Sequence, residues 1–232
     1  MNEQALSLRL ERVGNFVPAH ARLADIGSDH AYLPVALMLQ KKIQYAIAGE
    51  VVQGPYESAC KQVKKSKLAD KITVRLANGL KAIEQSDQID TVTICGMGGT
   101  LIRQILEEGQ SQLTGRERLI LQPNVGEATL RDWLIQHDYT IIAEEILEEN
   151  QKIYEIIVAE KLAQAAKLTA KEQMFGPYLM REVNPVFLKK WHRELNQRLK
   201  VKEQLAQSKN AHPEKIAELN QQIAWIKEVV ES

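Results

Sequence analysis

The feature that most constrains the fold is an alternation of short apolar strands with helical segments over residues 22–161. The predicted strands cover residues 22–26, 44–50, 72–76, 91–95, 119–123, 140–147 and 154–160. Predicted helices follow most of these strands, at residues 32–40, 55–65, 80–84, 100–107 and 128–137. This alternation predicts an α/β fold with a mainly parallel sheet and helices on both of its faces.

The end of this pattern differs from its beginning. The last two predicted strands have no helix between them and are separated by the polar residues 148–152, which suit a hairpin turn. We therefore expect a mostly parallel sheet whose last strand is antiparallel, an arrangement that by analogy is typical of class I methyltransferases. Before the first strand, Leu6, Leu10, Val13 and Val17 recur at helical spacing and predict an opening helix.

After residue 161 the spacing of apolar residues becomes helical. Apolar side chains recur three, four or six residues apart in residues 188–205, and three or four apart in residues 216–230. Asn184-Pro185 predicts a helix start, and residues 210–213 predict a stop and a restart. These patterns predict a helical hairpin, similar to a coiled coil, that is held together by apolar seams.

Charge also differs between the two parts of the chain. The sequence has 30 basic and 30 acidic residues, yet residues 1–162, the expected sheet domain, carry a net charge of −4, and residues 163–232, the expected helical domain, carry +4. Residues 189–202 hold six cationic side chains against Glu194 alone. This local field favours a nucleic-acid partner although the whole chain is neutral. A solvated helix face is the alternative.

Composition limits the other classes of function. Hydrophobic residues make up 44% and charged residues 26% of the 232 residues, the profile of a folded globular protein. No apolar run is long enough to cross a bilayer, and the first residues lack the basic and apolar segments of a secretory signal. Two isolated thiols, Cys60 and Cys95, fit a reducing compartment, so we expect a cytoplasmic protein. The histidines are scattered, which predicts no metal site.

Residues 23–34, Leu-Ala-Asp-Ile-Gly-Ser-Asp-His-Ala-Tyr-Leu-Pro, connect the first predicted strand to a helix. Ligands of open α/β sheets bind at the carboxyl ends of the strands, and Gly27 lets a ligand approach the backbone. Asp25 suits the ammonium of an amino acid better than a pyrophosphate, and the sequence lacks the G-x-G-x-x-G of dinucleotide sites. These features favour S-adenosylmethionine (SAM) as the ligand. A tight turn with Asp25 as a helix cap is the alternative.

The ends of the next two strands supply further polar groups. Glu50 ends the second strand, 25 residues after Asp25, where a carboxylate can accept both hydroxyls of a ribose. A plain surface glutamate is the alternative. Asn78-Gly79 follows the third strand, where the amide can bind the amino group of an adenine or form an ordinary turn.

The fourth and fifth strands end in small and amide residues. Residues 95–99, Cys-Gly-Met-Gly-Gly, leave open backbone at the edge where a methyl donor would lie, with a flexible loop as the alternative. Residues 122–124, Gln-Pro-Asn, offer two amides to the same cleft or form a strand-end turn.

Taken together, these motifs resemble one known family. Residues 28–34, 96–99 and 122–124 are similar to motifs of the bacterial tRNA (adenine-N1)-methyltransferases that modify adenine 22 of tRNA. The resemblance spans nearly the whole chain. It implies a SAM-binding Rossmann-like domain, S-adenosylhomocysteine as product, and a coiled-coil-like extension that helps to hold tRNA. An Asn/Asp-Pro-Pro-aromatic motif of many amino-group methyltransferases is replaced by residues 96–99, so the catalytic residue stays undefined.

The motifs and the resemblance together give two sets of site residues. The residues expected to line the SAM pocket are Asp25, Gly27, Ser28, His30, Glu50, Asn78, Gly79, Gly96 and Met97. The residues expected to bind the tRNA are Arg9, Arg12, Gln122, Asn124, Lys189, Lys190 and Arg193. Neither a membrane nor an obligate protein partner is expected, and a monomer is favoured.

The chemistry of adenine N1 limits what a catalytic residue must do. Ring N1 has a lone pair at neutral pH, so it needs no base before it attacks the sulfonium methyl. Because the product is cationic, rate gains come from alignment and from negative potential near the base. Asp29 and Tyr32 are the candidates for that role, although Asp29 could equally cap the following helix. The target adenine must leave its stack to reach the cleft, and phosphate contacts predict salt-sensitive binding.

Two other functions are compatible with the same residues. One is a SAM-dependent methyltransferase that acts on another RNA or on a small molecule, which the basic residues 189–202 disfavour. The other is a non-catalytic nucleotide-binding adaptor whose helical hairpin docks a partner protein, which the pair Asp25 and Glu50 disfavours.

Overall fold

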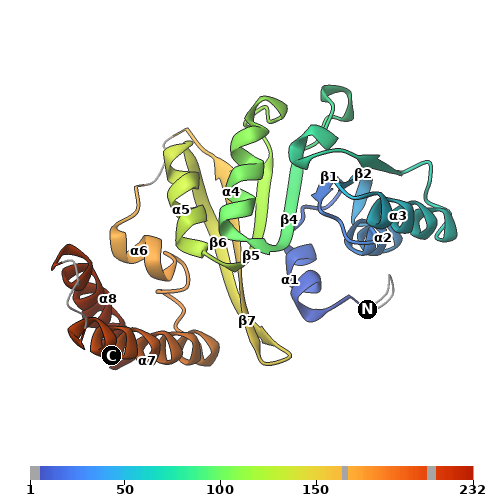
Figure 1. The fold of residues 1–232 in the computed structure, drawn as a ribbon. Helices are drawn as coiled ribbons and strands as arrows, with labels where there is room; N and C mark the ends of the chain where they lie inside the picture. Colours follow the sequence, from blue (N-terminus) through green and yellow to red (C-terminus); the bar gives the residue numbers. More distant parts are fainter. Residues whose placement is uncertain (1–5, 164–166, 208–212, 232) are drawn as a thin grey trace.

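A single mixed sheet organises the molecule (Figure 1). The computed structural model describes residues 6–163, 167–207 and 213–231, and within them seven strands pair in the order β3-β2-β1-β4-β5-β7-β6. The strands are β1 (Ala21–Ile26), β2 (Ile43–Glu50), β3 (Ile72–Leu76), β4 (Thr91–Gly98), β5 (Arg118–Val125), β6 (Tyr139–Glu149) and β7 (Lys152–Lys161). The helices are α1 (Leu8–Phe16), α2 (Tyr32–Leu39), α3 (Gln53–Lys65), α4 (Gly99–Glu108), α5 (Glu127–Gln136), α6 (Ala170–Phe175), α7 (Pro185–Gln207) and α8 (Pro213–Glu231).

Strand direction brings the predicted polar strand ends to one edge of the sheet. The strands β3, β2, β1, β4 and β5 are parallel, so their carboxyl ends lie at the same edge. The last strand, β7, runs antiparallel to both β5 and β6. The predicted α/β fold with an antiparallel last strand is therefore confirmed.

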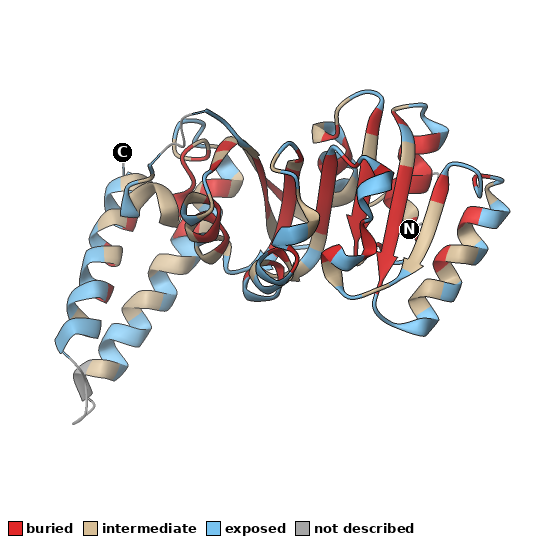
Figure 2. Cartoon of the chain, turned by 90° about the horizontal axis from the view of Figure 1, so that it is seen from above, coloured by how far each residue is buried: buried red, intermediate tan, exposed pale blue. Residues whose placement is uncertain are grey.

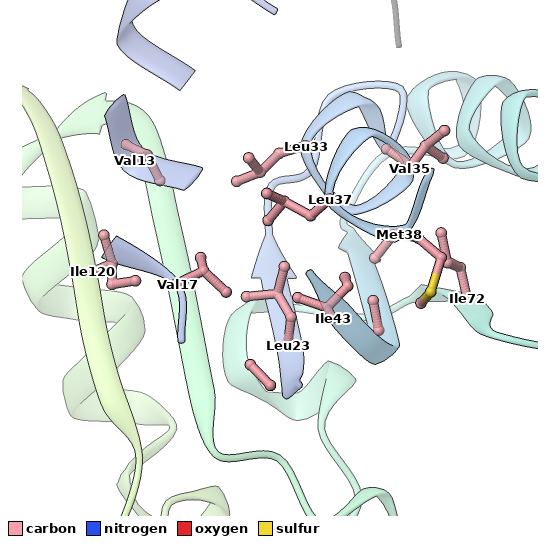
Figure 3. Close-up of a cluster of buried hydrophobic side chains, with 14 of the residues drawn as sticks. Val13, Val17, Leu23, Leu33, Val35, Leu37, Met38, Ile43, Ile72 and Ile120 are labelled. Carbon is pink, nitrogen blue, oxygen red and sulfur yellow. The ribbon is translucent and has the colours of Figure 1, made fainter. Parts of the chain in front are cut away.

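Helices cover both faces of the sheet, as Figure 2 shows by the buried strands at its centre. On one face, Val13 of α1 and Leu33 and Leu37 of α2 pack over Leu23 of β1 (Figure 3). On the other face, α4 and α5 bury their apolar residues against the central strands. Because both faces are covered, the central strands consist of nearly continuous apolar residues.

Two local predictions differ from the structure. The predicted helix at residues 80–84 is wrong: two short 3₁₀ turns, Gly79–Ala82 and Gln85–Asp87, stand there. Ile83 and Glu84 have extended backbones, with ψ values of 129° and 149°, which an α-helix does not contain. The side chain of Asp87 accepts a hydrogen bond from the backbone N–H of Glu84 at 2.7 Å. The helix α6 was not expected, although Thr169 and Glu172 form the capping box that starts it.

The C-terminal helices α7 and α8 form the predicted hairpin (Figure 1). The side chain of Asn184 accepts the backbone N–H of Phe187 at 2.9 Å, which confirms the predicted helix start. Phe187 and Trp191 of α7 pack with Phe175 of α6 and Ile226 of α8 in a separate apolar cluster. In the predicted turn, residues 210–212 lie outside the described residues. None of the described helices is long and apolar enough to span a bilayer.

A buried ion-pair network attaches α7 to the sheet. Arg131 of α5 is fully buried and donates to Glu144 of β6 at 2.7 Å and to Glu155 of β7 at 2.6 Å. Lys190 of α7 donates to Glu155 and to Glu127, both at 2.7 Å. Burial alone would raise the pKa of Glu155, but Arg131 and Lys190 outweigh it and lower that pKa. The network therefore holds α7 at a fixed place on the sheet.

The strand β6 contacts a different helix with each of its faces, because alternate side chains of a strand point in opposite directions. Glu148 pairs with Lys189 of α7 at 2.6 Å. Glu145 pairs with Arg12 of α1 at 3.3 Å, and Glu149 accepts the backbone N–H that begins α1 at 2.6 Å. A two-residue turn joins β6 to β7; its residues, Asn150 and Gln151, have φ values of +51° and +65°.

Candidate cofactor and substrate site

Asp25 ends β1 as a buried carboxylate. Its two oxygens accept hydrogen bonds from Ser28 Oγ and from Thr93 Oγ1 of β4, each at 2.6 Å. Burial raises the pKa of Asp25, and the two hydroxyls oppose that shift. Thr93 was not among the predicted residues, because only the parallel register that places it opposite Asp25 shows its role.

The loop between β1 and α2 is a tight left-handed turn. Asp29, His30 and Ala31 follow one another with φ values of +42°, +67° and +57°, a conformation that costs about 1–2 kcal/mol for an ordinary residue. Gly27 is also left-handed, at +70°, and a Cβ there would lie 2.1 Å from Met97 Cε. Such strain is typical of binding sites, where the surrounding structure maintains it.

Glu50 maintains this turn from the end of β2. Its Oε1 accepts the backbone N–H of Asp29 at 2.5 Å. Burial raises the pKa of Glu50, against the lowering effect of that N–H, and the negative charge of Asp25 raises it further. The two acidic strand ends therefore lie close enough to repel each other.

The alternative role for Asp29, a cap for α2, is not what the structure shows. The cap position is Ala31, which makes no side-chain capping bond, and Asp29 is exposed and 3.4 Å from His30. His30 in turn stacks on Tyr32, with ring centroids 5.3 Å apart. The candidate catalytic residues Asp29 and Tyr32 thus both neighbour His30.

The amides at the end of β5 hold the backbone of β4. Gln122 is buried, and its Oε1 accepts the backbone N–H of Gly96 at 3.0 Å. Asn124 Nδ2 donates to the carbonyl of Gly96 at 2.7 Å. Both side chains, predicted as substrate ligands, therefore fix the shape of the strand end at which the methyl donor would lie. Gly96 itself has a φ of +76°, which favours glycine.

Arg9 of α1 reaches into the same region from the opposite side of the cleft. Its Nη1 donates to Gln122 Oε1, and its guanidinium lies 5.4 Å from the ring centre of Tyr154. A cavity of about 230 Å³ is lined by Arg9, Leu10, Asp25, Gly27, Ser28, Asp29, Leu33, Cys95, Gly96 and Met97. Arg9 is the cation of this lining, and Asp25 and Asp29 are its acidic residues.

The remaining predicted residues lie further out. Asn78 is exposed just after β3, and its neighbour Ala77 donates its backbone N–H to the carbonyl of Glu50 at 2.8 Å. Gly79 follows with its left-handed φ. The hydrogen bond of Ala77 places this turn next to the end of β2, and neither Asn78 nor Gly79 lines the cavity beside Asp25. An adenine bound there would extend from a ribose at Glu50.

The cations of α7 divide into paired and unpaired groups. Lys189 is paired with Glu148 on the surface, and Lys190 is largely buried between Glu127 and Glu155. Arg193 is exposed and makes no ion pair among the described residues. Within those residues there is also no group of three or more metal-binding side chains.

Fold and charge together define the class of protein. A sheet that ends in an antiparallel strand, with carboxylates at the ends of β1 and β2 and an open β4 edge, is that of a class I SAM-dependent methyltransferase. Residues 23–228 match the family model described as tRNA (adenine(22)-N(1))-methyltransferase. The chain belongs to this family, as its resemblance predicted.

Known relatives agree with this membership over nearly the whole length. The tRNA (adenine(22)-N(1))-methyltransferase of Bacillus subtilis is 45% identical over 237 residues, covering 100% of this chain and 99% of the relative. Sp1610 of Streptococcus pneumoniae, solved with S-adenosyl-L-methionine, is 49% identical with a TM-score of 0.88, over 97% of this chain and 100% of that one. TrmK of M. capricolum, solved with the cofactor product S-adenosyl-homocysteine, is 30% identical with a TM-score of 0.83, over 97% and 98%.

Proposed function

We propose that the chain transfers the methyl group of SAM directly to ring N1 of adenine 22 in tRNA and releases S-adenosylhomocysteine. Membership of the family gives the reaction and the use of SAM. The tRNA is the macromolecular partner, and the bacterial cytoplasm, where tRNA is modified, is the proposed location. The proposed division of labour assigns SAM to residues 1–162 and additional tRNA contacts to residues 163–232.

The observation that carries the proposal is the match between the cleft and the charges of SAM. SAM has an ammonium, a carboxylate, a sulfonium and a ribose. Asp25 lines the cavity as an anion for the ammonium, and Arg9 lines it as a cation for the carboxylate. Glu50 stands one strand further along for the ribose hydroxyls. This assigns Arg9 to the cofactor and not to a tRNA phosphate.

The methyl step needs alignment and no base. SAM supplies an electrophilic methyl: the bond from N1 to carbon forms with the N1 lone pair while the carbon–sulfur bond breaks and its electrons stay on sulfur. Gln122 and Asn124 fix Gly96 so that the β4 edge stays open to the adenine. Asp29 provides negative potential near the base as it becomes cationic, and Tyr32 offers a ring beside it.

Methyl transfer to matched tRNA transcripts tests this function. Labelled SAM is supplied with a transcript that carries adenine 22 and with one that carries guanine there. We expect incorporation only into the first, and mapping of the product should show 1-methyladenine at that position. Equal incorporation into both transcripts would contradict the target. Incorporation into neither, with SAM bound, would favour another RNA or a small molecule, and absence of SAM binding would favour the adaptor alternative.

A further inference from the structure

A second cavity shares no lining residue with the cofactor cavity beside Asp25. It measures about 430 Å³ and lies between the beginning of α5 and one side of α7. Its apolar wall comes from four elements: Val125 of β5, Ile153 of β7, Met174 of α6 and Trp191 of α7. Binding pockets for small organic groups are typically about 300–1,000 Å³ and mostly apolar with a few polar groups. The cavity therefore has the size and surface of a site for one nucleotide.

The charges around the cavity fit a single phosphate. Lys190 pairs with both Glu127 and Glu155, and Arg198 pairs with Glu194. Arg193 lines the same cavity and makes no ion pair within the described parts of the chain, so it adds one uncompensated positive charge. Gly126, Glu127 and Ala128 at the start of α5 line the same cavity, and no side chain caps that helix.

The cavity adjoins the site of methyl transfer through one residue. Asn124 lines the cavity and donates to the carbonyl of Gly96 at 2.7 Å, and Gly96 lines the cofactor cavity. An adenine that has left its stack to reach Gly96 also unstacks the nucleotide next to it in the strand. Proteins bind such unstacked bases against aromatic and apolar side chains.

We propose that this cavity binds the nucleotide next to adenine 22 in the tRNA strand. Its base lies mainly against Val125 and Met174, since Trp191 is 3% exposed and packs on Phe175, and its phosphate lies near Arg193. The inference rests on the proposed function, because it takes the strand that carries adenine 22 as the substrate. The cavity would be a specificity site at the junction of the sheet with α7. There the ion pairs of Lys190 with Glu127 and Glu155 hold α7 against the sheet.

Three variants test the cavity. Ala128→Trp fills it from α5, Arg193→Glu reverses its free charge, and Lys202→Glu makes the same charge change on an exposed part of α7 outside it. We expect the first two to raise the KM for tRNA about tenfold or more and the control to raise it by about threefold at most. The Kd for SAM should stay within about twofold of the wild type in all three, which shows that they fold. Equal effects of Arg193→Glu and Lys202→Glu would reduce the site to the general field of α7 and overturn the proposal.

An abasic substitution identifies the occupant. Transcripts that lack the base of nucleotide 21 or of nucleotide 23 are compared in the wild type and in Ala128→Trp. For one of the two neighbours we expect the missing base to raise KM about tenfold in the wild type and to add nothing in the variant, since both changes remove the same contact. Independent effects for both neighbours would overturn the proposal. The wild type on the intact transcript reports separately on methylation of adenine 22.

Discussion

The cofactor edge and the junction with α7 both bury carboxylates, and they treat the charge in opposite ways. At the cofactor edge, Asp25 is met by two hydroxyls and Glu50 by a backbone N–H, and the pKa values of both are raised by burial. At the junction, Glu155 is met by the cations Arg131 and Lys190, and its pKa is lowered although burial opposes this.

The difference suits a binding site at the cofactor edge and a structural joint at the junction, where Glu155 pairs with Arg131 and Lys190. Neutral donors satisfy the hydrogen bonds of Asp25 and leave its charge available to a cationic ligand, at a cost in desolvation. Cationic donors cancel the charge of Glu155, so that the joint presents little charge to a ligand. In the proposed function, Asp25 is therefore the carboxylate that meets the ammonium of SAM.

Loss of the joint should produce the largest effect. Arg131→Met leaves Glu144 and part of Glu155 buried without a cation, and we expect the free energy of unfolding to fall by about 3–5 kcal/mol. Urea denaturation followed by circular dichroism measures this. The control Arg118→Met breaks a half-exposed pair with Glu160 and should cost about 1 kcal/mol or less. Equal losses would show that burial does not distinguish the two pairs.

Removal of a carboxylate at the cofactor edge should affect binding and spare the fold. Asp25→Ala should weaken SAM binding by about 100-fold, as expected when one partner of a buried charge contact is truncated. Stability should change little, since burial already penalises that charge. Calorimetric titration with SAM measures the first effect, and thermal unfolding the second. The control Asp70→Ala removes an exposed aspartate; if it weakened binding equally, the position of Asp25 would have no special role.

The reassignment of Arg9 predicts an intermediate effect. Arg9→Ala should raise the Kd for SAM about tenfold, because the carboxylate of SAM loses its charge-assisted hydrogen bond. Arg12→Ala, on the same helix, removes a cation that pairs with Glu145 and should leave the Kd within about twofold. If Arg9→Ala leaves SAM binding unchanged and weakens tRNA binding alone, Arg9 is a phosphate ligand as the sequence first indicated.

The smallest expected effect is a pH dependence. An ionised Glu50 accepts ribose hydroxyls, and burial raises its pKa above the ordinary value of 4.5. SAM affinity should therefore decrease as pH falls, starting at a higher pH than for an exposed glutamate. Glu50→Gln should weaken SAM binding a few-fold at neutral pH. It should also reduce the loss of affinity at acid pH, to which the protonation of Asp25 contributes as well. Calorimetric titration across the acid range measures it, and an unchanged profile in Glu50→Gln would exclude Glu50 as its source.

The structure also bears on a deletion of the helical hairpin as a test of its role in tRNA binding. Deletion of residues 184–232 would remove Phe187 and Trp191 from an apolar cluster and Lys190 from Glu155. Such a deletion would damage the sheet as well as the substrate arm, so single charge changes on α7 are the cleaner probes.

Features that depend on a few neighbouring residues, such as strand ends and helix starts, were predictable from the sequence. The strand ends at Asp25 and Glu50 follow from apolar runs that stop at a carboxylate, and the helix start at Asn184 follows from its capping residue. Membership of the family came from short motifs that are also local.

Features that depend on contacts distant in the sequence were not predictable. Thr93 meets Asp25 across 68 residues, and Arg9 meets Gln122 across 113. Lys190 belonged to a basic cluster in the sequence, yet its partners come from α5 and β7. In each case the sequence shows the type of residue, but its partner is known only once separate helices and strands have packed together.

The strand β6 carries one further consequence, which concerns its register. Residues 144–149 read Glu-Glu-Ile-Leu-Glu-Glu, so a slip by one residue would exchange the two faces and still present glutamates to both α1 and α7. Within residues 144–149, neither charge nor hydropathy thus distinguishes the two pairings. The selection rests on the two-residue turn at Asn150 and Gln151, whose positive φ values are those that a type I′ hairpin requires. A turn of two residues therefore helps to decide which glutamate pairs with α1 and which pairs with α7.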